Sequence, residues 1–451
     1  MHYLQPNPKE SLANTVARRY RPAYIERIMH YPEVASRTGF MSQQPLSGRR
    51  VIELGTMVAA PFATHIMSQM GAEVIKIEPP IGDTTRALVR GGPSGTLIAY
   101  SHSKKGLCLD LTSEGGKEAF RKLVATADVV IHNLSPAASR KLGVTFEDCN
   151  TVNPNVIHCH VKGYAHGPQA EDLATNPVAE AATGVMDDHR INGRPSRLGP
   201  SYHDQFAGTF AVIRVLGVML DPAPTEADRR IEIGLYETGL HLAARDLVGV
   251  QLKTQLLGRP EKEAGGEFAM PGYGAYEAKD GRWIYLLVMS DAHWRKLTTA
   301  LDMPERDNED MATLRQRKKL REDVEAAVRA GVGKWTYDEA TARLREAGVG
   351  FNEVLPLERV LDVPQARQPG KLRELDYRGL QFEVPEFPGQ AQVRPNLPPP
   401  EIGEHTVELL KSLGYSDEEC ATLIEQGAVK NGGPDDFAWA PVRDKSAKER
   451  A

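Results

Sequence analysis

One carboxylate in the sequence stands where a helix is expected to begin. In "RLGPSYHDQFAG" (residues 197–208), Pro and Gly give way to the apolar run "FAGTFAVIRVLGVML", and Asp204 lies just before that run. A carboxylate at a helix N-terminus is stabilised as an anion by ~0.3–1 kcal/mol when exposed. An ionised Asp can also attack a carbonyl carbon and form a covalent intermediate. From these residues alone, the role of helix N-cap is favoured over the catalytic one.

Three histidines of the sequence also have side chains suited to catalysis. His203 precedes Asp204 directly, but neighbours at i and i+1 point apart on a helix, and a carboxylate nucleophile needs no base at pH 7. His158 and His160 alternate along an expected strand, a pattern typical of packing residues. The sequence therefore favours structural roles for all three.

Four charged residues that precede Asp204 in the sequence leave two interpretations open. Arg194 and Arg197 in "GRPSRLG" are suited to binding the second carboxylate of a dicarboxylic substrate, or else they are charges of a surface loop. Glu171 and Asp172 either shape the pocket or lie on the surface, and the surface is the commoner place for carboxylates.

Several motifs that would indicate other enzymes are absent from the sequence. It contains no GxGxxG, no GxxxxGK[ST], no GxSxG and no HExxH, so nicotinamide, P-loop, serine hydrolase and zinc-protease chemistry lose their main support. The turn after the first expected strand is "GTMVAAPF", whose small residues allow a phosphate to approach a helix N-terminus. Close packing of a helix on a sheet needs the same small residues.

Composition restricts the class of protein further. The chain has 451 residues, room for two or three domains, and its net charge of −5 gives no general nucleic-acid or membrane footprint, although Lys and Arg outnumber Glu in the first 50 residues. No apolar run reaches the ~18 residues of a membrane span, and no secretory leader is expected. The four cysteines form no CxxC, and no His/Cys cluster has zinc spacing. These features predict a cytoplasmic protein without a structural metal.

The elements that must position these side chains follow an alternating pattern. "RVIEL", "AEVIKIE", "GLCLDL", "DVVIHN" and "NVIHCHVKG" are expected strands, and the segments between them, such as "APFATHIMSQMG" and "SEGGKEAFRKLVATA", have helical spacing. Strands that alternate with helices predict a parallel sheet covered on both faces, with ligands beyond the carboxyl ends of the strands.

The later part of the chain predicts a second, smaller α+β unit. "RRIEIGLYETGLHLAARDLVGVQLK" is expected to be a strand and a helix, residues around 279–281 the turn of a hairpin, and residues 305–331 one charged surface helix. The Pro-rich residues 383–406 are expected to be a crossing linker without regular structure, and "TVELLKSLGYSDEECATLIEQG" two short helices. A short helix is expected within residues 17–30.

Seven ordered blocks of sequence resemble the class III CoA-transferases, a family that includes the α-methylacyl-CoA racemases. The resemblance covers about residues 46–430, and the first block is "LSGRRVIELGTMVAAPFATHIMSQMGAEVIKIEPPIGDTTR". The blocks continue through "KKGLCLDL", "ADVVIHNLSPAASRKLG", "NPNVIHCHVKGYAHGP", "RLGPSYHDQFAG", "YEAKDGRWIYLLV" and "PEIGEHTVELLKSLGY".

The resemblance implies roles for individual residues. The family's nucleophilic aspartate stands in DxxxG, which makes Asp204 the nucleophile, and an aspartyl-CoA thioester the intermediate. Asn133 and Leu134 match the segment that lines the CoA site. Lys141 matches a basic residue there, and Lys104 matches the family's basic residue near the nucleotide end of CoA. Val58 and Ala59 match backbone contacts after the first strand. No permanently bound cofactor is implied, because CoA thioester is a substrate.

The resemblance also implies an architecture and leaves alternatives open. We expect an interlocked homodimer, with a large Rossmann-like parallel-sheet domain and a smaller α+β domain. Succinyl-CoA is a plausible donor. A racemase is the alternative activity, but the His of its acid/base pair would fall near residues 171–172 and is absent. One subunit of a heteromeric transferase is another alternative.

The expected domain boundaries divide the chain into six parts. They are an arm at 1–45, the large domain at 46–220 with the CoA-binding part, a linking strand and helix at 221–262, the small domain at 263–360, a segment returning to the large domain at 361–430 and a flexible tail at 431–451.

Overall fold

The computed structural model describes residues 44–89, 93–258, 270–389 and 397–433. The helix expected within residues 17–30, and nearly all of the expected arm and tail, lie outside the described residues. In the described part of the chain, no helix is both long enough and apolar enough to cross a membrane.

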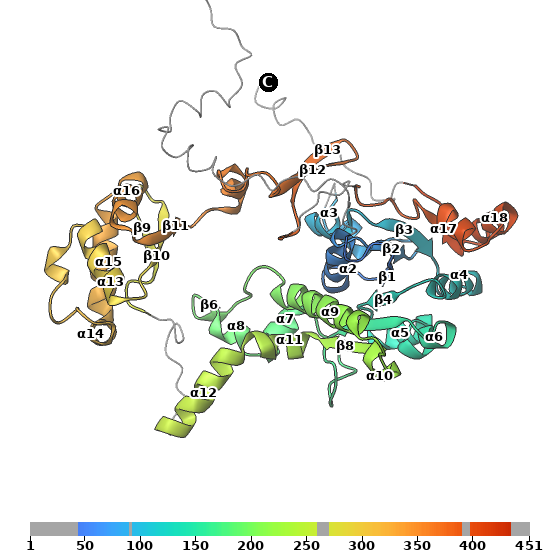
Figure 1. Ribbon diagram of the computed structural model, residues 1–451, viewed down its shortest axis with the longest axis horizontal. Helices are drawn as coiled ribbons and strands as arrows, with labels where there is room; N and C mark the ends of the chain where they lie inside the picture. Colours follow the sequence, from blue (N-terminus) through green and yellow to red (C-terminus); the bar gives the residue numbers. More distant parts are fainter. Residues whose placement is uncertain (1–43, 90–92, 259–269, 390–396, 434–451) are drawn as a thin grey trace, which may run out of the picture. The chain divides into compact units, whose positions relative to one another are not determined.

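A seven-stranded sheet is the framework of the larger part, as the alternating pattern predicted (Figure 1). Its order is β14-β3-β2-β1-β4-β5-β8, and neighbouring strands pair in parallel except β14, which runs antiparallel to β3. Because β1 pairs with β2 on one side and β4 on the other, the chain changes direction across the sheet at β1. The strands are β1 (Arg50–Leu54), β2 (Glu73–Glu78), β3 (Lys105–Leu109), β4 (Val129–His132), β5 (Ile157–Lys162), β8 (Arg230–Gly234) and β14 (Val429–Lys430).

Successive residues of the central strands β1, β2 and β4 pack into two separate cores. Val51 of β1 joins one core with α2 (Ala59–Gln69) and α9 (Tyr202–Leu220). Its neighbour Ile52 joins the other core, with α4 (Glu114–Val124). Strands buried on both faces explain the near-continuous apolar runs seen in the sequence.

Shorter elements connect the strands and carry much of the polar chemistry. The expected strand and helix after residue 229 become a strand and two helices, because the chain bends at Ala243. The remaining elements of this part are η2 (Thr84–Ala87), α3 (Gly95–Ser101), α5 (Pro136–Leu142), α6 (Phe146–Val152), α7 (Asn176–Ala182), α8 (Val185–Asp188), β6 (Arg190–Ile191), β7 (Arg194–Pro195), α10 (Glu226–Arg229), α11 (Leu235–Leu242) and α12 (Ala244–Leu257).

A three-stranded antiparallel sheet with order β11-β10-β9 organises residues 270–353. The expected hairpin is confirmed, because β9 and β10 pair across a turn in which Gly281 has a φ of +81°. The helices pack around the buried ring of Trp294. The elements are β9 (Gly274–Glu277), β10 (Trp283–Leu287), α13 (Asp291–Ala300), η3 (Pro304–Arg306), α14 (Leu314–Lys319), α15 (Arg321–Gly333), α16 (Tyr337–Ala347) and β11 (Gly350–Glu353).

The prediction of one charged helix over residues 305–331 is wrong. Thr313 and Gln316 form a capping box that starts α14, and the helical geometry is interrupted at Leu320 before α15 begins. The Arg317 guanidinium is buried and binds Asp291 of α13, 2.7 Å away. Two short helices therefore replace one surface helix, and the first is tied inward.

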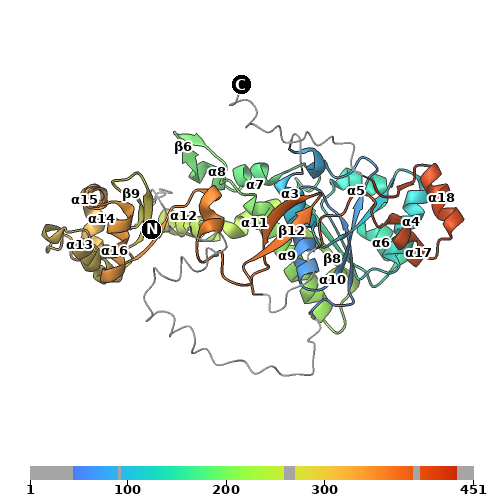
Figure 2. The same ribbon diagram turned by 90° about the horizontal axis from the view of Figure 1, so that it is seen from above.

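The return segment begins with regular structure where none was expected. After η4 (Leu357–Asp362), β12 (Leu372–Tyr377) pairs with β13 (Leu380–Pro385), so the linker prediction is wrong for residues 383–385. This hairpin packs against Ile98 of α3. The two expected terminal helices are confirmed as α17 (Thr406–Ser412) and α18 (Asp417–Glu425), and they pack on the same core as α4 (Figure 2).

Candidate active site

A cavity of about 520 Å³ opens beyond the carboxyl ends of β1, β4 and β5. This is the edge at which open parallel sheets bind ligands. The start of α2 and the start of α9 meet there. Its lining includes Thr56, Met57, Val58, Ala59, Asn133, Leu134, Lys162, Asp172, Asn176, Arg197, Ser201 and Asp204.

Asp204 lies inside the first turn of α9, two residues beyond its start. The N-cap position belongs to Ser201, whose side chain makes no capping hydrogen bond. Two N–H groups of the first turn, those of His203 and Asp204, instead donate to Asn176 Oδ1 at 2.9 and 3.4 Å. The structural alternative for Asp204, a helix N-cap, is therefore wrong: another side chain caps the helix, and the Asp204 carboxylate is left for the cavity.

Burial changes the acidity of this carboxylate. Desolvation raises the pKa of Asp204 from its ordinary 3.8 to about 6, with Arg197 opposing the shift and Glu180 adding to it. A helix N-terminus favours the anion, so burial outweighs the dipole here. At pH 7 the group is mostly ionised yet poorly solvated, which is the condition of a reactive carboxylate.

The side-chain amide of Asn133 forms a clasp that fixes the loop leading to Val58 and Ala59. Asn133 Oδ1 accepts from the Thr56 N–H at 3.0 Å, and Asn133 Nδ2 donates to the Thr56 carbonyl at 2.8 Å. The next residue, Met57, has a φ of +62°, a strained value for a non-glycine residue. The clasp thus holds a bent loop that directs Val58 and Ala59 to the cavity.

A buried ion cluster supports the same loop from below. Lys76 Nζ lies 2.9 Å from Glu53 Oε1, 2.7 Å from Asp83 Oδ2 and 2.8 Å from the Gly55 carbonyl. Asp83 in turn accepts from the Thr56 hydroxyl at 2.8 Å. Paired and hydrogen-bonded in this way, the charges tolerate burial.

Lys104 belongs to this cluster and does not reach the cavity. Its Nζ is 2.6 Å from Glu53 Oε2 and 2.9 Å from both the Pro61 carbonyl and Thr64 Oγ1. The side chain has no exposed surface, and burial lowers the pKa of Lys104 to about 8. The three N–H groups of Lys104 are thus directed to acceptors inside the protein, and its role in CoA binding stays a prediction.

Lys141 is also separated from the other predicted site residues. It lines a different depression, between α4, α5 and α6, together with Lys117 and Arg121. Of the seven residues that the resemblance implied, the cavity brings together Val58, Ala59, Asn133, Leu134 and Asp204. Lys104 and Lys141 lie elsewhere.

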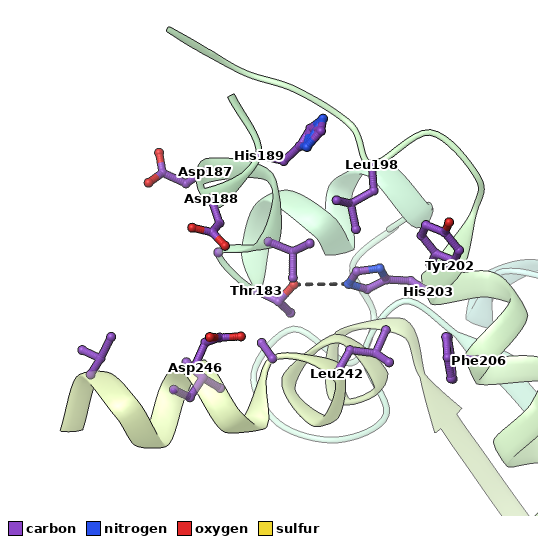
Figure 3. Close-up of a pocket in the computed structure, with 15 residues that line it drawn as sticks. Thr183, Asp187, Asp188, His189, Leu198, Tyr202, His203, Phe206, Leu242 and Asp246 are labelled. Atoms are coloured by element: carbon purple, nitrogen blue, oxygen red, sulfur yellow. Dashed lines mark hydrogen bonds between the residues drawn. The ribbon is translucent and has the colours of Figure 1, made fainter. Parts of the chain in front are cut away.

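His203 faces away from Asp204. Its ring lines a second cavity, of about 600 Å³, with Tyr202 and Phe206, and its Nε2 lies 3.3 Å from the Thr183 hydroxyl (Figure 3). Burial lowers the pKa of His203, which favours a neutral ring. This placement agrees with the expectation that neighbours on a helix point apart.

The other two histidines bind main-chain carbonyls within the sheet. His158 Nε2 lies 3.0 Å from the Val144 carbonyl, and His160 Nε2 lies 2.8 Å from the Leu134 carbonyl. Burial lowers the pKa of both rings. Their packing role is the one that the alternating pattern favoured.

The charged residues left open by the sequence divide between site and surface. Arg197 and the exposed Asp172 line the Asp204 cavity. Glu171 is exposed and pairs with Arg140 at 2.7 Å, while Arg194 lies in the short strand β7 and is absent from the cavity lining. Within the described ranges, no group of three or more His, Cys, Asp or Glu side chains is arranged to hold a metal ion.

Sequence reasoning missed two residues, Asn176 and Glu180. Both lie on α7, both are buried, and Asn176 Nδ2 donates to Glu180 Oε1 at 2.5 Å. The Asn-Pro pair at the start of α7 predicts a helix start, but nothing local indicates that the amide caps a helix that begins 26 residues later.

Comparisons with known proteins agree on one family. The model of CoA-transferase family III matches residues 46–406. The chain is 28% identical over 400 residues to a succinyl-CoA–L-malate CoA-transferase alpha subunit of Chloroflexus aurantiacus, covering 84% of this chain and 92% of the relative. It is 28% identical to a succinate–glutarate CoA-transferase of Agrobacterium fabrum, covering 82% of this chain and 96% of the relative. A crystal structure of a CAIB/BAIF family protein from Brucella suis superposes with a TM-score of 0.70, at 25% identity, over 82% of this chain and all of that chain.

Proposed function

The chain belongs to CoA-transferase family III, and we propose that it moves CoA from a dicarboxylic acyl-CoA to a carboxylic acid through a thioester on Asp204. The observation that carries the proposal is a single cavity in which the partly desolvated Asp204 faces the start of α2. CoA transfer as such follows from the family and from the CoA-transferases among its relatives. The covalent route and the substrates are the parts we propose.

The proposed reaction balances without a proton. An Asp204 oxygen attacks the thioester carbonyl, the C–S bond breaks, and a mixed anhydride and the CoA thiolate form. The thiolate attacks the aspartyl carbonyl and expels the donor acid as a carboxylate, which leaves aspartyl-CoA. An acceptor carboxylate then attacks this thioester, and the same two steps in reverse yield the new acyl-CoA and free Asp204.

The acidity of Asp204 suits this chemistry. With a pKa of about 6, the carboxylate is available at neutral pH, whereas its burial leaves it less stabilised by water than an exposed Asp. Forming a neutral anhydride or thioester at this position relieves a buried charge. The enzyme thereby favours the covalent intermediate over its free anion.

The start of α2 is the proposed site for negative charge that develops on the substrate. Its N-cap residue, Val58, makes no side-chain capping hydrogen bond, and Pro61 lacks an N–H. Val58 and Ala59 both line the cavity with Asp204. Main-chain N–H groups at a helix start can stabilise an oxyanion or a phosphate.

The nucleotide end of CoA has space in an adjoining pocket of about 290 Å³. It shares Thr56 and Leu134 with the Asp204 cavity and extends along the carboxyl ends of β2 and β3, past Ile77 and Leu109. Its walls are largely apolar, as an adenine ring requires. We propose that CoA crosses from this pocket to Asp204.

Arg197 supports a dicarboxylic substrate. It lines the cavity, is exposed, and within the described residues acts on Asp204 only through its charge. A guanidinium that lacks an ion partner can bind a second carboxylate through two hydrogen bonds. Both curated relatives cited above are named for dicarboxylic acids, and we propose succinyl-CoA as the donor.

A homodimer is the proposed assembly. No residue of α12 is buried within the chain. Three of its exposed side chains, those of Val248, Leu252 and Leu256, are apolar. An apolar helix surface of this kind indicates a partner. Because one relative is named an alpha subunit, a heteromer is the second candidate.

All four cysteines are unpaired thiols, which supports a reducing, cytoplasmic location.

The test is a substrate screen with the purified chain. Succinyl-, acetyl- and formyl-CoA are each incubated with a panel of mono- and dicarboxylic acids, and new CoA esters are identified by mass spectrometry. We expect new esters from succinyl-CoA with dicarboxylic acceptors. Incorporation of solvent deuterium at the α-carbon of an acyl-CoA, without an acceptor acid, would instead indicate a racemase.

A further inference from the structure

Glu180 is a fully buried carboxylate behind the wall of the Asp204 cavity. Its relative exposure is 0%, and in the described part of the chain no Lys or Arg forms an ion pair with it. Both oxygens accept hydrogen bonds: Oε1 from Asn176 Nδ2 at 2.5 Å and Oε2 from the Leu198 N–H at 3.2 Å. Burying a carboxylate without a cation is costly, so a packing role alone would be served better by an apolar residue.

The bond from Asn176 determines which way its amide points. Because Nδ2 donates to Glu180, Oδ1 must face the start of α9, where it accepts from the N–H groups of His203 and Asp204. The flipped amide would place N–H groups against N–H groups there. Glu180 thus fixes the acceptor that caps the helix of Asp204.

The second bond connects Glu180 to the other charged group of the cavity. Leu198 follows Arg197 directly, so holding the Leu198 N–H restrains the backbone beside the guanidinium. Glu180 is therefore linked to both segments that carry charges into the cavity, directly to the Arg197 loop and through Asn176 to the start of α9.

We propose that Glu180 is a positioning residue for the reaction: through Asn176 it fixes the start of α9 and hence Asp204, and through Leu198 it fixes the loop of Arg197. This inference rests on the proposed role of Asp204 as the nucleophile. Glu180 itself does not line the cavity and does not contact the substrate. Its effect on the reaction is through the placement of the two charged groups and through its own negative charge.

Two substitutions separate the bond to Asn176 from the rest of the Glu180 interactions. Glu180→Gln keeps an oxygen that can accept from Asn176 Nδ2 but removes the negative charge and the acceptor of the Leu198 N–H, whereas Glu180→Ala removes all three. The other charges that face Asp204 are Arg197, which lowers its pKa, and Asp172 and Lys162, which line the same cavity. Those groups are unchanged in both variants, so a shift in the pH profile reports on Glu180.

The experiment measures kcat and KM of the full-length protein with succinyl-CoA and a dicarboxylic acceptor from pH 5 to 9. For Glu180→Gln we expect kcat within about threefold of wild type and an acid limb of kcat/KM moved to lower pH. For Glu180→Ala we expect kcat to fall about ten- to a hundredfold, the cost of a misplaced nucleophile, with KM for acyl-CoA little changed. Glu171→Gln is the matched control, because Glu171 is exposed and pairs with Arg140 outside the cavity; its profile should match wild type.

The outcomes distinguish this proposal from the one on which it rests. If Glu180→Gln has the wild-type pH profile, or folded Glu180→Ala keeps wild-type kcat, Glu180 is not a positioning residue even when Asp204→Ala is inactive. If Glu180→Ala fails to fold, the pH profile of Glu180→Gln decides the question alone. If Asp204→Ala retains turnover, the proposed nucleophile is wrong, whatever the Glu180 variants do.

Discussion

Removing the charge of Asp204 should make the protein more stable at high pH. The pKa of Asp204 rises from 3.8 to about 6 in the folded protein, mainly because the carboxylate is desolvated. Each pKa unit corresponds to ~1.4 kcal/mol, so a shift of roughly two units costs the folded state about 3 kcal/mol once the group is ionised. This shift is the net of burial and of the favourable interaction with the helix dipole. The expected stabilisation of Asp204→Asn is therefore about 3 kcal/mol at pH 8.

The sign of the pH dependence follows from the direction of the shift. A raised pKa means that the folded state holds the proton more tightly than the unfolded state, so stability from this group is complete below pH 3.8 and is lost as pH rises through about 6. Asn cannot ionise and is insensitive to this change. The advantage of Asp204→Asn should therefore be largest at pH 8 and disappear near pH 4.

The assay is denaturant unfolding of the wild type and Asp204→Asn at several pH values between 4 and 8, with mass spectrometry to verify that the Asn has not deamidated. Asp172→Asn is the matched control, because Asp172 lines the same cavity but is exposed. It should change the free energy of unfolding little at any pH. A variant at position 204 that is no more stable than wild type at pH 8, or whose advantage does not vary with pH, would refute the burial argument.

Three further predictions concern the cavity, the loop beneath it and the assembly. Arg197→Gln should move the acid limb of kcat/KM to higher pH, because Arg197 lowers the pKa of Asp204, and should raise KM for dicarboxylic acids more than for monocarboxylic ones; equal changes for both would contradict the assigned role. Lys76→Met should lower the free energy of unfolding by about 3–5 kcal/mol in a denaturation assay, because it leaves two buried carboxylates, Glu53 and Asp83, without this partner. Sedimentation should detect a dimer of the 49.6 kDa chain, and Leu252→Glu on the exposed face of α12 should weaken it, whereas a wild-type monomer at micromolar concentration would exclude that assembly.

The strands and helices of the large sheet could be predicted because each is specified by residues within or next to it in the sequence. Strands such as β1 and β4 are short β-branched runs that end at turn residues, and α4 carries its own Ser113 cap and amphipathic pattern. The same reasoning failed over residues 305–331, where a capping box at Thr313 starts α14, Arg317 binds Asp291, and the helical geometry is interrupted at Leu320. The density of charged residues did not distinguish one continuous surface helix from two short helices.

The site could be predicted in part for the same reason. Asp204 stands at a visible boundary between a loop and an apolar helix, and Asn133 follows a predicted strand. The position of the Lys104 ammonium could not be predicted, because a long side chain can turn inward, here to Glu53, which is 51 residues away in sequence. Glu180 carries no local signal at all, since its significance comes from contacts with Asn176 and Leu198 that only the folded chain creates.

The central claim is that Asp204 carries CoA covalently, and trapping that intermediate tests it most directly. The enzyme is mixed with succinyl-CoA and no acceptor, digested, and its peptides are analysed by mass spectrometry before and after hydroxylamine. We predict CoA on the peptide that contains Asp204, its release by hydroxylamine, and no adduct in folded Asp204→Ala, whose turnover should fall by orders of magnitude. An Asp204→Ala variant that keeps more than about a tenth of wild-type turnover, or a CoA adduct that persists in it, would contradict the account.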